Sequence, residues 1–73
     1  MKLYSYIKDY ADNYGISIHK LEQRTGLTNG TIRRWDECVP KVDNLLAVVE
    51  FFDLDIKEVI KCAENYEQPI DNG

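Results

Sequence analysis

The sequence has few cysteines and histidines and no long apolar run, which argues against a zinc protein, a membrane protein and a secreted protein. Its 73 residues include two cysteines and one histidine, too few and too scattered to supply the roughly four close ligands of a zinc site. No apolar run approaches the roughly 20 residues that span a bilayer. The polar start of the chain, MKLYSYIKDYADNY, has no hydrophobic core of a signal peptide. We therefore expect a cytoplasmic protein with no metal, no cofactor and no membrane contact.

The short length argues against an enzyme. A chain of 8.5 kDa forms one domain and buries only about 60% of the surface that its unfolded state exposes, so its core is thin. The residues offer no Ser-His-Asp set, no carboxylate pair in a pocket and no phosphate-binding loop. We expect neither catalysis nor a small-molecule ligand.

Charge is unevenly distributed along the chain. The formal net charge is −4 and the pI is about 4.8, which taken alone disfavours binding to nucleic acid. Residues 17–41, however, hold five basic and three acidic side chains, a net of +2, and the rest of the chain carries −6. Local electrostatic potential steers binding. The positive charge of this segment is therefore a better guide to the binding partner than the net charge of the whole chain.

Apolar residues recur at intervals of three and four, which is typical of helices, and no stretch alternates as a strand does. Ser17, Thr28 and Asp55 occupy positions suited to N-caps, and Asp55 with Glu58 forms a capping box. Tyr14 falls on the apolar stripe of the first helix. The pattern predicts an all-α fold with five helices, at about 2–13, 17–24, 28–36, 42–52 and 55–64.

The second and third predicted helices are joined by a short turn that contains a glycine, as in a helix-turn-helix. Such a motif needs a glycine in the turn and apolar residues around it and late in the second helix. The residues at those places are Leu21, Gly26, Leu27, Ile32 and Trp35. Trp35 is expected in the core.

The stretch ISIHKLEQRTGLTNGTIRRW resembles the Cro/repressor-type helix-turn-helix proteins, which are lambda-repressor-like members of the XRE family. The sequence GLTNGTIRRWDE, followed by Pro40 and VDNLLAVVEFFDLDIKEVI, looks most like small phage-type repressors of Gram-positive bacteria. The resemblance implies a five-helix lambda-repressor-like DNA-binding domain over residues 1–64, with a central motif at about 17–36. A flexible C-terminal tail is expected at 65–73. The chain departs from the family at Ile18, where Gln is usual, and at Glu22, where a small Ala is usual.

A helix over 28–36, at about 100° per residue, turns its apolar side inward and both arginines outward beside Gly30. Arginine bonds bidentately to guanine or reaches a phosphate, and Asn29 is suited to adenine. Without the motif, two adjacent arginines are more simply a solvated helix face. The candidate DNA-binding residues are Ser17, His19, Lys20, Thr28, Asn29, Gly30, Thr31, Arg33, Arg34 and Lys41.

The resemblance implies a sequence-specific transcriptional regulator of double-stranded DNA, a repressor of a bacterial or phage-infected cell. One short recognition helix reads few base pairs, so we expect a weak homodimer on a palindromic operator. Phe51, Tyr66 and Ile70 are candidates for the partner surface, and Phe51 is equally well explained as core periphery. The alternative is an antitoxin-like or inhibitor-like protein-interaction module that uses the same fold and an acidic surface without binding DNA.

Overall fold

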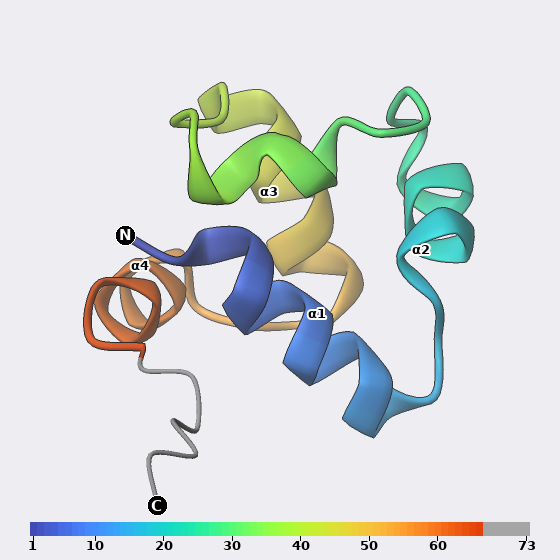
Figure 1. Ribbon diagram of the computed structural model, residues 1–73. Helices are drawn as coiled ribbons and strands as arrows, with labels where there is room; N and C mark the ends of the chain where they lie inside the picture. The colour runs from blue at the N-terminus through green and yellow to red at the C-terminus, as the bar shows by residue number, and fades with distance from the viewer. Residues whose placement is uncertain (67–73) are drawn as a thin grey trace, which may run out of the picture.

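The computed structural model describes residues 1–66, which form four α-helices and one short 3-10 helix and contain no strand. All-α class is confirmed, and the four α-helices begin and end within one residue of their predicted bounds. None of the helices in this range is long and apolar enough to cross a membrane. The elements in Figure 1 are α1 (Leu3–Tyr14), α2 (Ile18–Thr25), the 3-10 helix η1 (Ile32–Asp36), α3 (Val42–Phe51) and α4 (Ile56–Glu64).

The core forms where the apolar stripes of these helices meet. Trp35 is 4% exposed, as expected, and the stripe of α1 is buried at every predicted position except Tyr10, which is half-buried, and Tyr14. Tyr14 is 59% exposed, so the predicted extension of the buried stripe to this residue is wrong. It is the last residue of α1, and Gly15 turns the chain away with a φ of 95°. The buried apolar residues are Leu3, Ile7, Ala11, Leu21, Ile32, Trp35, Leu45, Val48, Val49, Phe52, Val59 and Ala63.

The third predicted helix is wrong in both length and type. Residues 28–31 form a turn, in which the Thr31 N–H donates to the Thr28 carbonyl at 3.1 Å, so Thr28 caps no helix. Gly30 has a φ of 92°, and Asn29 has no positive φ. A positive φ at the third position alone is typical of a type II turn and lies outside the right-handed helical region. The helical segment therefore begins only at Ile32 and is a 3-10 helix.

Two predicted N-caps are confirmed. The Ser17 hydroxyl accepts a hydrogen bond from the Lys20 N–H at 3.1 Å, which satisfies a free donor at the start of α2. The Asp55 carboxylate accepts from the Lys57 N–H at 3.3 Å at the start of α4.

A third cap comes from a distant part of the chain. At the start of α1, Lys2 supplies no side-chain cap, and Asp36 at the end of η1 accepts from the Ser5 N–H at 3.1 Å and from its hydroxyl at 2.6 Å. Burial raises the pKa of Asp36, but the hydrogen bonds from Ser5 and Tyr4 and the charge of Lys2 outweigh it, so the pKa is lowered. This clamp holds η1 against α1, its neighbour in Figure 1.

The hydrogen bonds between Asp36 and Ser5 should make the stability of the fold depend on pH in the acid range. Because the pKa of Asp36 is lower in the folded state, its stabilisation is complete above the unfolded carboxyl's pKa and is lost as the pH falls through the folded value. Asp36→Asn should lower the melting temperature at neutral pH and flatten its fall in acid. Melts followed by circular dichroism between about pH 7 and pH 2 measure both effects. Glu37→Gln, an exposed neighbour, is the control; equal acid slopes for Asp36→Asn and the wild type would contradict the clamp.

Candidate nucleic-acid interface

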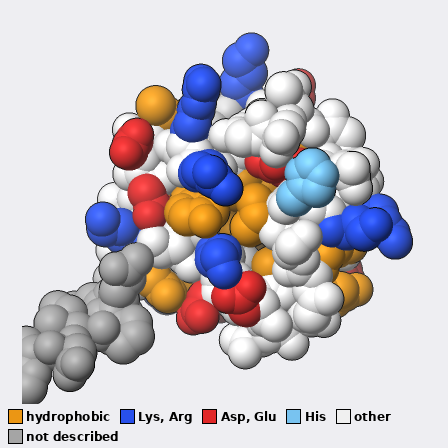
Figure 2. All heavy atoms as spheres, turned by 45° about the vertical axis from the view of Figure 1, so that its right-hand side comes forward, with side chains coloured by type: hydrophobic (Ala, Val, Ile, Leu, Met, Phe, Trp, Pro, Cys, Tyr) orange, Lys and Arg blue, Asp and Glu red, His pale blue; other side chains and the backbone are white. Residues whose placement is uncertain are grey.

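The predicted DNA-binding residues lie in three parts of the chain that follow one another: the start of α2, the turn at 28–31, and η1 with its exit. All are exposed except Gly30 and Thr31, which are half-buried. Figure 2 brings the α2 side of Figure 1 forward and shows Lys and Arg side chains spread around hydrophobic ones, with some Asp and Glu side chains at the margins. We refer to this surface, defined by residues 17–20, 28–34 and 41, as the basic face.

The two arginines of the basic face diverge. A 3-10 helix has three residues per turn, so Ile32 and Trp35 lie on one edge and both are buried. Arg33 and Arg34 leave η1 about 120° apart, compared with about 100° in the predicted α-helix, and they line different hollows. Arg33 lines a small hollow of about 50 Å³ toward α2, together with His19 and Asn29.

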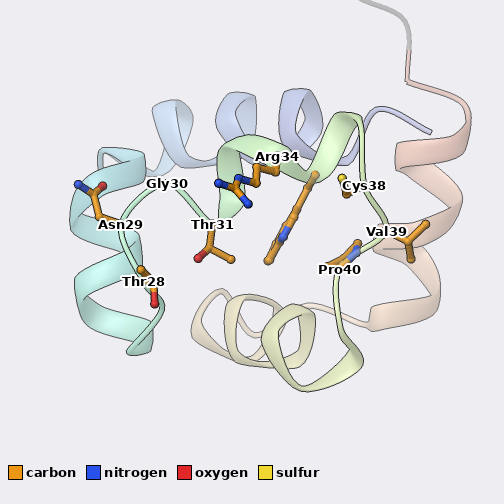
Figure 3. Close-up of a pocket in the computed structure, with 9 residues that line it drawn as sticks. Thr28, Asn29, Gly30, Thr31, Arg34, Cys38, Val39 and Pro40 are labelled. Atoms are coloured by element: carbon orange, nitrogen blue, oxygen red, sulfur yellow. The ribbon is translucent and has the colours of Figure 1, made fainter.

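Arg34 borders a larger hollow of about 280 Å³ between the turn and the segment 38–40, with Trp35 also in its lining. In Figure 3 the Arg34 side chain reaches over this hollow toward Thr31. Asn29 points away from it, and its Oδ1 lies 3.4 Å from His19 Nδ1 on α2. The Asn29–Gly30 turn therefore separates two recesses, each with one exposed guanidinium at its edge.

Sequence analysis missed the role of Glu22 in shaping this face. Its side chain is 2% exposed, and its carboxylate accepts the Gly30 N–H with both oxygens, at 3.0 and 3.1 Å, and the Ile32 N–H at 3.0 Å. These bonds fasten the turn and the start of η1 to α2 and satisfy a buried charge that would otherwise be costly. The signal in the sequence was Glu22 itself, an acid at a position where the Cro/repressor-type proteins that the sequence resembles usually have a small residue.

Exposed basic side chains outnumber exposed acidic ones in residues 17–41. Of the three acids in residues 17–41, Glu22 is buried and Asp36 is bound to Ser5, which leaves Glu37 exposed. The five basic side chains of this segment are all exposed, and among residues 1–66 none of them forms an ion pair. An approaching anion meets the exposed cations Lys20, Arg24, Arg33, Arg34 and Lys41.

In the part of the chain that the structure describes, there is little support for a metal site or a disulfide. There, no group of three or more His, Cys, Asp or Glu side chains is placed to hold a metal ion. Cys38 and Cys62 are free and exposed. A comparison of the chain with known protein families, with curated proteins and with solved structures finds no match.

Proposed function

We propose that this protein is a sequence-specific regulator that binds double-stranded DNA, built as a lambda-repressor-like helix-turn-helix domain and acting as a phage-type repressor. The observation that carries the proposal is the basic face together with the neighbouring Arg24: five exposed cations within one segment of 25 residues, in which Glu22 is buried and Asp36 is half-buried. The order of a helix (α2), a turn and a short 3-10 helix (η1) over the predicted motif supports the proposal. The proposed location is the cytoplasm of a bacterial or phage-infected cell.

In the proposed complex, η1 and the turn at 28–31 enter the major groove. Arg34 reads a base edge, Asn29 is suited to adenine, and Arg33 is shared between a base edge and a phosphate. Ser17, Lys20 and Lys41 contact phosphates, which position the protein without specifying a sequence. His19, Thr28, Gly30 and Thr31 complete the contact surface.

Because η1 is short, the proposed recognition of DNA requires a second copy of the chain. Five residues of 3-10 helix extend about 10 Å, which corresponds to about three base pairs. A weak homodimer on a palindromic operator doubles that number. Among the proposed partner-surface residues, Phe51 is half-buried and its ring centroid lies 5.9 Å from that of the exposed Tyr14. Tyr66 packs near Tyr6, and Ile70 lies outside the described residues.

Retention on a library of random duplexes, measured over a range of salt concentrations, tests the proposal. We expect retention at low salt that falls as salt rises, because phosphate contacts release counterions, followed by enrichment of a palindrome. A protein that is not retained on any duplex at low salt would be better explained as an antitoxin-like or inhibitor-like interaction module.

A further inference from the structure

A third hollow, of about 440 Å³, is lined by residues of α1, of α4 and of the segment just after α4, none of which belongs to the basic face. Three tyrosines contribute to its lining. The Tyr6 ring centroid is 6.3 Å from that of Tyr10 and 6.3 Å from that of Tyr66, and the latter pair meets edge to face. The remaining lining residues are Asp9, Asn13, Cys62 and Asn65.

The polar and charged groups around this hollow favour a positive occupant. No Lys or Arg lines it, and Tyr66 donates a hydrogen bond to one oxygen of the Asp9 carboxylate at 3.3 Å. The pKa of Tyr6 is raised by burial first and then by its neighbours Cys62, Tyr10 and Glu58. Burial and then Asp9 raise the pKa of Tyr66. Both hydroxyls therefore stay protonated, and the faces of the rings carry partial negative charge.

We propose that this aromatic hollow binds an arginine side chain of a protein partner. A cation is attracted to an aromatic face within about 6 Å of the ring centroid, and the spacing of Tyr6, Tyr10 and Tyr66 brings more than one ring within that reach. A guanidinium stacks on such rings and donates to carboxylates, and the Asp9 carboxylate lines the same hollow. The net charge of −6 outside residues 17–41 favours a basic protein segment over nucleic acid as the partner of this part of the chain.

This inference is independent of DNA binding. The residues of the aromatic hollow come from α1, α4 and the residues just after α4, and none of them lies in the segment 17–41 that carries the basic face. The two sites should therefore be separable by substitution.

Titration of the full chain with an acetylated and amidated Gly-Arg-Gly peptide, followed by the tyrosine ring signals in NMR spectra, tests the inference. We expect saturable shifts of Tyr6, Tyr10 and Tyr66. The same peptide with citrulline, a neutral isostere of arginine, should cause none. Saturation by the citrulline peptide at the same concentration, or no saturation by the arginine peptide, would overturn the inference.

A pair of variants then distinguishes binding at the aromatic hollow from attraction to the overall negative charge of the protein. Asp9→Asn keeps an acceptor for Tyr66 and removes the charge, and should weaken arginine-peptide binding about two- to fivefold. Asp12→Asn is the matched control, because Asp12 lies on the same helix, is exposed and pairs with Lys8 outside the hollow. Equal effects of the two substitutions would show that the peptide senses only the overall charge and would overturn the site.

Discussion

Replacing Trp35 with alanine is expected to leave the chain without a cooperative fold at room temperature. The side chain is 4% exposed and lies on the same edge of η1 as Ile32, so it fixes η1 to the core. Truncating a buried tryptophan costs about 3–5 kcal/mol. At about 0.05–0.15 kcal/mol per residue, a domain of this size has little stability beyond that cost.

Far-UV circular dichroism and a thermal melt measure the effect of Trp35→Ala. Trp35→Phe is the control, because it keeps an aromatic ring in the core and should retain helical signal and a cooperative transition. If Trp35→Ala still melts cooperatively within a few degrees of the wild type, the packing of η1 described here is wrong.

Glu22→Ala is expected to have the second largest effect on stability. It removes the acceptor for the Gly30 and Ile32 N–H groups, and a buried donor left without a partner costs about 1–3 kcal/mol. Glu22→Gln should lie between the wild type and Glu22→Ala, since its carbonyl serves one N–H while its NH₂ group faces the other. Melting temperatures and the hydrogen-exchange rates of the Gly30 and Ile32 amides measure the change.

Glu37→Ala is the matched control for Glu22→Ala, because it removes the same charge from an exposed position beside η1. Its melt and its exchange rates at Gly30 and Ile32 should match those of the wild type. If Glu22→Ala also leaves both amides as slow to exchange as in the wild type, the turn at 28–31 is held by something other than the carboxylate.

Helical periodicity was enough to predict the all-α class and the approximate bounds of the four α-helices. The apolar stripe containing Leu3, Ile7 and Ala11 located α1, and side-chain caps at Ser17 and Asp55 located the starts of α2 and α4. These signals depend on residues close together in sequence, so no tertiary information was needed. Tyr14 shows the limit of the method, since periodicity continues past the point at which a helix leaves the core.

The candidate site was less predictable because its shape depends on one dihedral angle and one distant contact. Asn29-Gly30 is a strong turn signal, yet the expectation of a helix from Thr28 treated Gly30 as a residue within that helix. The positive φ of Gly30 and the bonds from Glu22, eight and ten residues earlier, replace that helical turn. The direction of each arginine follows from this change, which periodicity does not encode.

The central claim, that the basic face binds DNA, is tested most directly by the double variant Arg33→Ala, Arg34→Ala. The folded variant, checked by an unchanged melt, is titrated with the palindrome selected by the wild type. Each lost base contact should cost about 1–3 kcal/mol, so affinity should fall at least about tenfold. Each lost phosphate contact should reduce the salt slope by about one unit.

The matched control is Lys57→Ala, Lys61→Ala, which removes the same charge from exposed positions on α4, outside the basic face. If the basic face is the DNA-binding surface, the α4 variant binds the selected duplex nearly as tightly as the wild type, and the η1 variant does not. Equal binding by the folded η1 variant and the wild type would contradict the claim.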